Sequence, residues 1–391
     1  MIPAVGAVTA ILAGFGIVAL DHATEARLGF QGDAEAARSI LSTIAAAMIT
    51  FTGLVFSITI VALQLASAQF SPRVMRTFLR DRTSKLALAT FVATFGFAFT
   101  VMRSTRADSV PGISVTIAIV LVFASTAVFI YYINHTAHAI RAVAIIDSVG
   151  SETRQRIEAL FPLEPPAHFP EPDLTGDHIA VTNDGDPGVI IGFDSDRIVS
   201  AASEQDAVVV LHAGVGDFVP TGAPLYESYG TASLCDVSDF ISLGQERTMQ
   251  QDAAFGLRQL VDLASKALSP GINDPTTAGQ AIDQIHDLLR RLVMRPLEPG
   301  RAADAEGAVR LVFPAMGWAD YVALAVDEIR IYGAGSLQVM RQLHEMLEDL
   351  LALASDERRP PLREQLVLLA AASERELVDA RDRRFLGSSP G

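Results

Sequence analysis

The long apolar runs of this chain lie almost entirely within its first 134 residues. Four runs lie at about residues 2–20, within 40–70, at 86–102 and at 113–133. Each is close to the roughly 20 apolar residues that cross the hydrocarbon of a bilayer. The first run lacks the basic start and the short apolar core of a secretory signal, so we interpret it as a retained span. The sequence therefore predicts a transmembrane domain of four helices over residues 1–134.

Basic side chains in the loops predict the orientation of these helices. The loop after the second run has five of them, whereas the loops after the first and third runs have two each. Cytoplasmic loops are enriched in Arg and Lys, so we expect a multi-pass protein of the bacterial inner membrane with both termini in the cytoplasm. The loop arginines have two readings: topology determinants that contact lipid headgroups, or a basic ring at the inner mouth of a pore. They are Arg73, Arg76, Arg80 and Arg82, and Lys85 is the fifth basic residue.

Polar side chains recur every seven residues in the second run. Seven residues are nearly two turns of helix, so these side chains share one face. An amide inside a span is costly unless a partner or water meets it. One interpretation is packing between helices, and the other is that several copies surround a water-filled path, which requires a homo-oligomer. The candidate pore-lining residues are Thr43, Thr50, Ser57, Gln64 and Ser71.

Three further expectations concern the membrane helices. The second helix should begin near Asp33 and run past Gln69, which makes it longer than the hydrocarbon is thick. Small residues four apart in the first run, among them Gly14, should let another helix approach closely. Tyr131 and Tyr132 end the fourth run and are typical of interfacial anchors. A second polar set, elsewhere on the second helix, consists of Thr52, Thr59 and Ser67.

Charge is divided unevenly along the chain. Residues 1–150 contain ten basic and seven acidic side chains, a net charge of +3, and because the whole chain carries −15, residues 151–391 carry −18. An acidic domain is repelled by phosphate backbones, so we exclude nucleic acid as a partner. The single cysteine, Cys235, rules out an intrachain disulfide and a thiol metal cluster. We expect no metal and no cofactor; the expected partners are the lipid bilayer, further copies of the chain and small ions.

The region after the membrane domain divides into four segments. We expect a linker helix at residues 135–161 that continues the fourth span as one rod, and a stiff Pro-rich linker at residues 162–172. Short β-branched runs predict a β-rich domain at residues 173–245. Apolar residues three and four apart predict a mainly helical domain at residues 246–391, with one strand in AVRLVF at 308–313. The fold class is a transmembrane α-helical domain plus a cytoplasmic α+β region.

One segment of the β-rich domain, HAGVGDFVPTGAPLYE, resembles the hairpin of barrel-sandwich domains. This is the fold of biotinyl and lipoyl carriers, which attach their cofactor to a lysine at a hairpin tip. No lysine occurs between Lys85 and Lys266. The resemblance therefore implies a barrel-sandwich-like fold without carrier chemistry.

The segment SPGINDPTTA is the main candidate for a ligand site in the cytoplasmic region. Asp274 suits a helix N-cap and Pro275 the first helical position. The simple interpretation is a corner between two helices, and the alternative is a small anion held by the amides of the helix start. A polar group in WADYVALAVDEIR is expected to form ion pairs with arginines. The possible ligand-binding residues are Asn273, Asp274, Thr276 and Thr277.

Three segments together carry a resemblance to a known family. They are VALQLASAQFSPRVMRTFLRDR, FGLRQLVDLASKALSPGINDPTTA and WADYVALAVDEIRIYGAGSLQVMRQL, in this order. They resemble the domain-of-unknown-function family 2254 of predicted bacterial membrane proteins. The resemblance covers most of the chain and implies the membrane topology, but it implies no activity and no functional residue.

Motifs of the common enzyme classes are missing from the sequence. HEMLE, at His344, has Glu348 where a zincin needs its second histidine, and there is no Walker A loop or G-x-S-x-G elbow. We therefore expect no enzyme. The leading hypothesis is an oligomeric channel-like protein that conducts ions along its second helix and is assembled and regulated by its cytoplasmic domain. The alternative is a non-conducting membrane-anchored scaffold or sensor whose cytoplasmic domain binds a partner or ligand.

Overall fold

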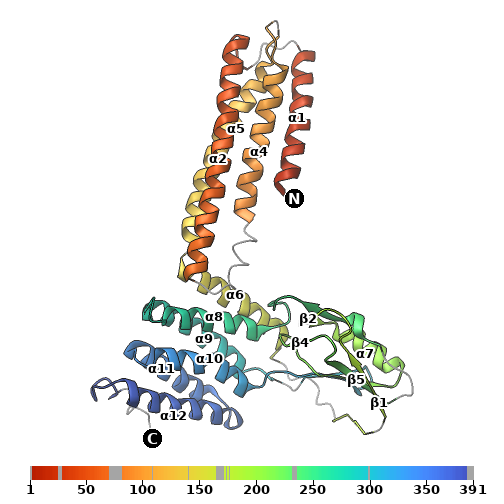
Figure 1. Cartoon of the computed structure of the whole chain (residues 1–391), viewed down its shortest axis with the longest axis vertical. Coiled ribbons are helices and arrows are strands. Elements are labelled where there is room, and N and C mark those ends of the chain that lie inside the picture. The colour runs from red at the N-terminus through yellow and green to blue at the C-terminus, as the bar shows by residue number, and fades with distance from the viewer. Residues whose placement is uncertain are drawn as a thin grey trace. The chain divides into compact units, whose positions relative to one another are not determined.

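The computed structural model divides the chain into two compact units, Met1–Ile145 and Ile146–Gly391. Figure 1 labels the helices of both units and some of the strands, and each unit is described by itself. The described residues are 2–384 with short gaps. The gaps are residues 25–28, 70–81, 108, 140, 164–170, 173, 176, 231–235 and 298–299.

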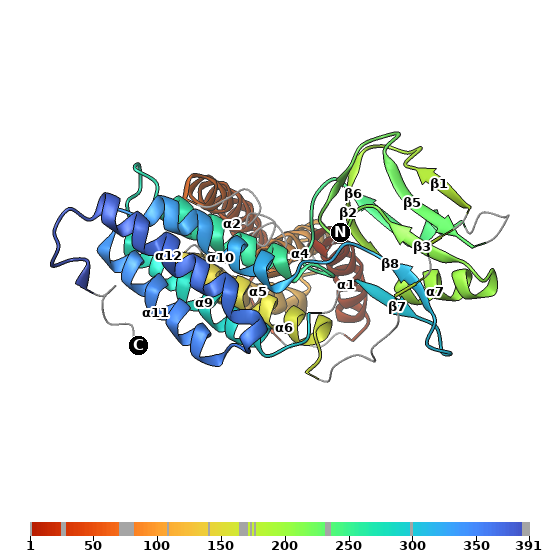
Figure 2. The same cartoon turned by 90° about the horizontal axis from the view of Figure 1, so that it is seen from below.

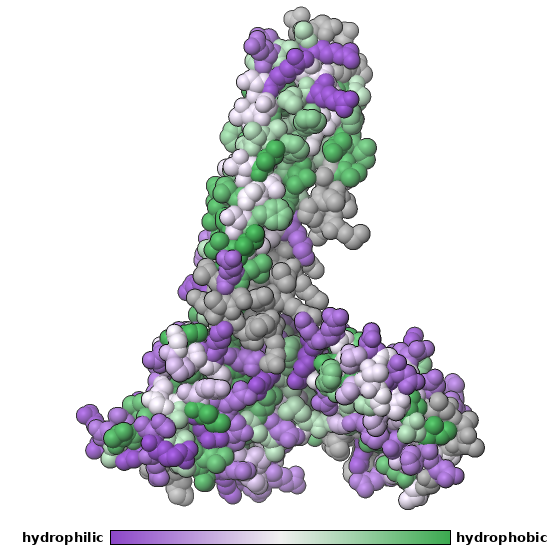
Figure 3. Space-filling view, in the orientation of Figure 1, coloured by the Kyte–Doolittle hydropathy of each residue, from purple (hydrophilic) through white to green (hydrophobic). Residues whose placement is uncertain are grey.

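The regular secondary structure in the described part of the first unit is helical, apart from an isolated β-bridge between Arg106 and Ser109. Its helices are α1 (Ile2–Thr24), α2 (Ala34–Gln69), α4 (Arg82–Ser104) and α5 (Gly112–Ala139). Three stretches are long and apolar enough to cross a membrane, and Val8–Asp21 in α1 is a shorter apolar stretch. Figure 3 shows apolar side chains over much of the visible face of these helices. The three spanning stretches are Ala34–Gln64, Thr83–Ser104 and Gly112–His138.

Helix α2 begins where the sequence predicted. The amide of Ala36 donates to Oδ1 of Asp33 over 2.8 Å, so Asp33 caps the helix. The helix has 36 residues, about 54 Å at the usual rise per residue. It is therefore longer than the hydrocarbon layer, as expected.

Close packing holds the first unit together. The ring of Phe51 in α2 lies 4.6 Å from the ring of Phe129 in α5 and 5.6 Å from that of Phe91 in α4, measured between centroids. Helix α1 approaches α4 at Gly14, where a Cβ would lie 3.3 Å from Cγ2 of Thr100. The expected close approach at Gly14 is therefore confirmed.

The expected role of Tyr132 as an interfacial anchor is wrong. Its side chain is fully buried. Its hydroxyl lies 2.8 Å from Oγ1 of Thr59 and donates to the carbonyl of Val55 over 3.2 Å. A phenol inside a bundle needs a hydrogen-bond partner, and α2 provides one. Tyr131, by contrast, is exposed and stacks on His135.

The expected continuous rod after the fourth span is also wrong. Helix α5 ends at Ala139, and a separate helix, α6, spans Ala142–Leu160. The amide of Arg141 donates to the carbonyl of His138, three residues back, over 3.2 Å. Such a three-residue bond tightens the last turn and is a common way for a helix to end.

Two small sheets lie in the described part of the second unit. The strand order is β1-β5-β3-β8-β7 in one sheet and β4-β2-β6 in the other. Helix α7 (Ser195–Glu204) and both sheets contribute to one apolar core, which includes Ile198, Val209 and Leu311. The strands are β1 (His178–Thr182), β2 (Gly188–Phe193), β3 (Val208–Leu211), β4 (Phe218–Val219), β5 (Pro224–Tyr229), β6 (Ile241–Gly244), β7 (Arg301–Ala303) and β8 (Val309–Val312).

Strand β8 is the strand predicted within AVRLVF. It pairs in parallel with β3, so that Val209 lies opposite Leu311. Asp304 organises the turn before it, because its carboxylate accepts the amide of Ala308 over 2.9 Å and Nε of Arg310 over 2.7 Å. Residues beyond 300 thus complete a sheet that begins at residue 178.

The remaining helices of the second unit form a bundle. Helix α8 packs on α9 and α10, and α11 packs on α9 and α12. Figure 2 shows these helices gathered on one side of the second unit and the strands on the other. Their bounds are α8 (Ala253–Ala267), α9 (Pro275–Val293), α10 (Trp318–Gly333), α11 (Leu337–Leu353) and α12 (Arg359–Glu376).

A short polar segment joins the sheets to this bundle. Asp252 caps α8 by accepting the amide of Phe255 over 2.9 Å, and Arg247 donates to its other oxygen over 2.7 Å. Burial raises the pKa of the Asp252 carboxyl, and Arg247 opposes that rise. Gln251 bonds both the amide and the carbonyl of Phe193 at the end of β2, over 3.0 and 3.1 Å. The sheets and helices are therefore fixed to one another within this unit.

Candidate functional site on the second helix

Helix α2 has a buried face that packs on its own unit. We call it the inner seam. Its residues recur at spacings of three, four and seven, as in a helix that packs along its length. They are Ala37, Leu41, Ile44, Met48, Val55 and Ala62, all buried.

The polar stripe of α2 lies on the opposite face. Two residues along a helix turn it by about 200°, so Thr43, Thr50, Ser57 and Gln64 each lie nearly opposite a buried residue of the inner seam. All four side chains are exposed in the isolated chain. The stripe is therefore not used to pack the unit to which it belongs.

Three small residues and Ile60 complete this face and give it a regular pattern. Ser39, Ala46, Gly53 and Ile60 alternate with the stripe at spacings of four and three, which is the heptad pattern of helices that pack on helices. A Cβ at Gly53 would meet nothing within 4 Å. Larger apolar side chains flank the face, Ile49 and Phe56 on one side and Leu54 and Val61 on the other. We call the exposed face the outer seam: Ser39, Thr43, Ala46, Thr50, Gly53, Ser57, Ile60 and Gln64.

Hydrogen bonding divides the stripe into two halves. Thr43 donates to the carbonyl of Ser39 over 2.9 Å, and Thr50 donates to that of Ala46 over 3.0 Å. Within the described residues, Ser57 and Gln64 have no hydrogen-bond partner. An amide has two donor hydrogens and an acceptor oxygen. Among the described side chains of α2, Gln64 is therefore the polar group that most needs water or a second chain.

The second polar set of α2 serves the interior of the unit instead. Thr59 donates to the carbonyl of Val55 over 2.7 Å and contacts Tyr132 of α5. Thr52 donates to the carbonyl of Met48 over 2.8 Å. For Thr59, the interpretation as packing between helices is thus confirmed.

The expected inner mouth of a path lies largely outside the described residues. This applies to Ser71, Arg73, Arg76 and Arg80, and Arg82 is described only as the first residue of α4. Their role stays a prediction.

The helix corner at SPGINDPTTA has the predicted cap. Asp274 is the N-cap of α9, and Pro275 is its first residue. The amides of Thr276 and Thr277 donate to Oδ1 of Asp274 over 3.1 and 3.0 Å. The hydroxyl and the amide of Thr277 lower the pKa of the Asp274 carboxyl. Asn273 has a positive φ of 50°. The two amides that an anion would use therefore already have an acceptor within the chain.

The polar group of α10 forms the expected ion pairs. Asp327 lies 3.1 Å from Nη2 of Arg330, and Glu328 lies 2.6 Å from Nη1 of Arg258. Asp320 has a different role, since it accepts the amide of Gly317 over 2.9 Å and caps α10.

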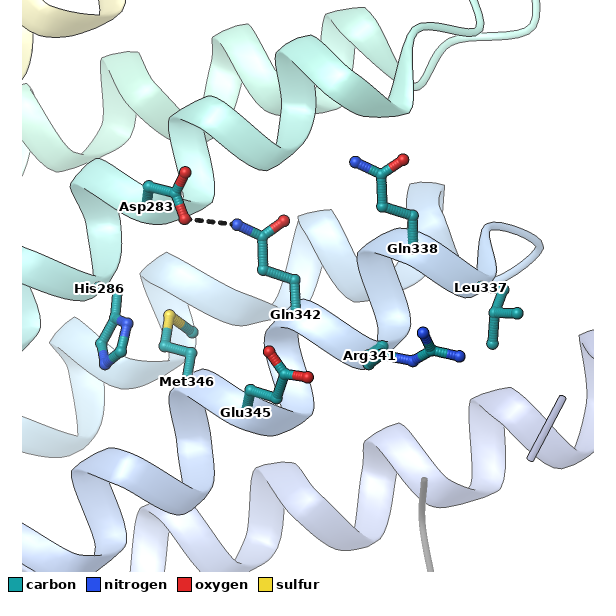
Figure 4. Close-up of a pocket in the computed structure, with 8 residues that line it drawn as sticks. All are labelled: Asp283, His286, Leu337, Gln338, Arg341, Gln342, Glu345 and Met346. Atoms are coloured by element: carbon teal, nitrogen blue, oxygen red, sulfur yellow. Dashed lines mark hydrogen bonds between the residues drawn. The ribbon is translucent and has the colours of Figure 1, made fainter. Parts of the chain in front are cut away.

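A groove between α9 and α11 was not predicted from the sequence. It has a volume of about 620 Å³ and is open to solvent (Figure 4). A polar face on α11 at three- and four-residue spacing was the available signal, but spacing alone does not show which helix lies beside it. Its lining residues are Asp283 and His286 of α9 and Leu337, Gln338, Arg341, Gln342, Glu345 and Met346 of α11.

Comparison with known proteins agrees with the apolar helices of the first unit. The family described as predicted membrane protein (DUF2254) matches residues 1–349. The chain belongs to this family. Uncharacterized proteins of Mycobacterium tuberculosis and of Mycobacterium bovis are 33% identical to it over 380 residues, which are 92% of this chain and 72% of theirs. No solved structure gives a significant match. The DUF2254 match thus supports the membrane assignment.

Proposed function

We propose that this DUF2254 protein is a homo-oligomeric, channel-like protein of the bacterial inner membrane. In this proposal the outer seams of α2 from several copies surround an aqueous path for small ions. The observation that carries it is Gln64, an amide that is exposed on a spanning stretch and has no partner in the described chain. In hydrocarbon such a group is costly, so water or another copy meets it.

The shape of the outer seam supports contact with further copies. Ala46 and Gly53 leave the backbone accessible to a neighbouring helix, as small residues do in membrane interfaces. Ile49 and Phe56 on one flank, and Leu54 and Val61 on the other, would separate the seam from lipid. Four helices are few for a conduit, so the path is formed between copies rather than within one.

The charges at the two ends of α2 set the ion preference in this proposal. The outer seam carries no charged residue between Ser39 and Gln64. Selectivity would therefore arise at the ends, from Glu35 near the start and from the arginine loop after Gln69. The same loop supports the orientation with both termini in the cytoplasm.

The second unit assembles and regulates the oligomer in this proposal. We assign its two sheets a barrel-sandwich-like arrangement, supported by their common core. The hairpin before β4 adds to this: Gly216 has a φ of 97°, and the amide of Gly214 donates to Asp217 over 2.8 Å. No enzymatic activity is proposed.

A sealed scaffold is the second candidate function. Thr43 and Thr50 favour it, because a hydroxyl that already donates within its own helix is tolerated without water. In that case the outer seams pack together without a path, and the cytoplasmic unit binds a partner or ligand.

Thiol labelling separates the two candidates. In a Cys235→Ser background, cysteine replaces Ser57 or Gln64, with Phe56→Cys on the flank and Val55→Cys on the inner seam as matched controls. The channel proposal expects a charged, membrane-impermeant thiol reagent to modify positions 57 and 64 but neither control. Crosslinking at 57 without modification would instead identify the sealed scaffold.

Electrical recording tests conduction itself. Purified protein in planar bilayers should show a current that Ser57→Leu and Gln64→Leu reduce, because each substitution removes a polar lining group. Ile49→Leu, on the flank, is the control and should conduct as the parent does. Equal conductance in all of them would remove α2 from the path.

A further inference from the structure

The groove between α9 and α11 has one side that is already satisfied by its own chain. Gln342 donates to the carbonyl of Gly279 over 2.9 Å and to Asp283 over 2.6 Å. His286 lies 2.7 Å from the carboxylate of Asp349. These bonds fix α9 beside α11, so the groove is a formed surface.

Two opposite charges on α11 remain unpaired beside this groove. Arg341 and Glu345 are both exposed, and neither forms an ion pair or hydrogen bond within the described residues. Figure 4 shows the guanidinium of Arg341 extending away from Glu345. An acid that follows a base by four residues is the weaker arrangement for pairing within a helix, which explains why the two do not meet.

The opposite signs of these two charges make α11 complementary to a second, antiparallel α11. Consider a two-fold axis perpendicular to α11 that passes midway between Arg341 and Glu345. This axis generates a second α11 that runs in the opposite direction. In such a contact residue i meets residue j and j meets i. Arg341 of each copy then faces Glu345 of the other, and two ion pairs form from one sequence.

We propose that a second copy of this chain docks on the α9–α11 groove through its own α11. Leu337, which lines the groove and is partly exposed, supplies the apolar part of the contact; Met346 also lines the groove but is buried. An open groove along a helix suits a helix better than a small molecule, which is usually enclosed on most sides. This contact is separate from the outer seam of α2, and it places a two-fold axis among the copies, so the oligomer has an even number of chains.

Crosslinking between two tagged chains tests the geometry. Full-length Cys235→Ser chains carrying either Arg341→Cys or Glu345→Cys are expressed together with different tags and treated in membranes with a short thiol crosslinker. The mixed pair should crosslink several times more than either identical pair. Equal yields, or no crosslink at all, would overturn the proposal.

Charge reversal tests the ion pairs independently. Arg341→Glu and Glu345→Arg should each weaken association by about tenfold or more, because two attractive contacts become repulsive. The double variant Arg341→Glu/Glu345→Arg should restore it. Arg363→Glu, an exposed arginine of α12, is the control and should leave association unchanged. Failure of the double variant to restore association would contradict the antiparallel contact.

Failure of the α11 contact can be distinguished from failure of the proposed channel function. Crosslinking through Ser57→Cys reports the outer seam in the same membranes. If it persists while the crosslinks at 341 and 345 are missing, the α11 contact is wrong and the α2 proposal stands. If the α11 crosslinks form without the α2 crosslink, the copies meet through the second unit alone.

Discussion

Inside the first unit, hydroxyls on neighbouring helices contact one another. Thr59 contacts Tyr132, and Thr94 lies 3.0 Å from Ser125. On the outer seam of α2, Ser57 and Gln64 have no partner in the described part of the chain. The same helix thus carries paired polar groups toward its own bundle and unpaired ones away from it.

This difference shows which polar groups belong to the fold. A buried hydroxyl that is paired stabilises the packing of its own helices, so its loss should lower stability. An unpaired amide on a lipid-accessible face contributes nothing to the fold of one chain. Its effect should therefore be measured in the assembled protein.

Two glycines give the largest expected contrast. Gly53→Leu should leave the melting temperature of the detergent-solubilised monomer unchanged, because a Cβ there meets nothing within 4 Å. It should weaken assembly by roughly tenfold or more, since it blocks close approach of a second helix. Gly14→Leu should do the reverse and destabilise the monomer by about 1–3 kcal/mol through overpacking against α4. Size-exclusion chromatography and thermal unfolding measure the two effects, and an unchanged assembly in Gly53→Leu would break the comparison.

The comparison of paired and unpaired polar groups can also be made in the second unit. There, Arg358 is a cation with several partners. Its guanidinium donates to the carbonyls of Leu292 and Val293, both over 2.8 Å, at the C-terminus of α9. It also lies over the ring of Trp318 at 5.7 Å. Arg358→Ala should lower the free energy of unfolding by about 2–3 kcal/mol.

The neighbouring Arg359→Ala is the matched control for that measurement. Arg359 pairs only with the exposed Asp356 three residues back among the described residues. Its loss should cost less than about 0.5 kcal/mol. Chemical denaturation measures the free energy of unfolding of both variants. If both lose a similar amount, the partners of Arg358 do not stabilise the fold.

Single hydroxyl deletions sharpen the comparison further. Tyr132→Phe keeps the ring but leaves Thr59 and the carbonyl of Val55 without the phenol, so it should cost about 1 kcal/mol. Ser57→Ala removes an unpaired hydroxyl and should change the stability of the monomer by less than about 0.5 kcal/mol. Unfolding in detergent measures both, and an equal effect would mean that the outer seam also contributes to the fold.

The smallest expected effect concerns the pH dependence of a paired carboxylate. The hydrogen bond from Arg310 holds the pKa of Asp304 below its ordinary value of 3.8. This pair therefore stabilises the fold above pH 3.8, and its contribution is lost as the pH falls through the lower pKa of the folded state. Melting temperatures from pH 6 down to pH 3 should show a steeper loss for the parent than for Asp304→Asn. Parallel curves would contradict this role.

The sequence predicted the features that depend on local pattern. The start of α2 at Asp33 and the cap of α9 at Asp274 follow from side chains that compete for free amides. The strand β8 follows from its β-branched residues, and the stripe on α2 follows from helical periodicity. Each of these features depends on residues that are close to one another in the sequence.

The features that were missed depend on which elements lie together. Tyr132 reads as an interfacial anchor until Thr59 is known to face it. The break between α5 and α6 falls in a stretch whose pattern remains helical, so periodicity alone does not show it. That Arg341 and Glu345 lie beside α9 is a property of the folded chain and not of spacing.

The position of β8 late in the sequence has a consequence during translation. Strand β3 leaves the ribosome about a hundred residues before its partner β8, and until then one edge of Val208–Leu211 is open. An apolar edge of this kind pairs readily with other chains. A polypeptide that stops at residue 245 would lack β8 and keep that edge open, so we expect it to aggregate when it is expressed alone.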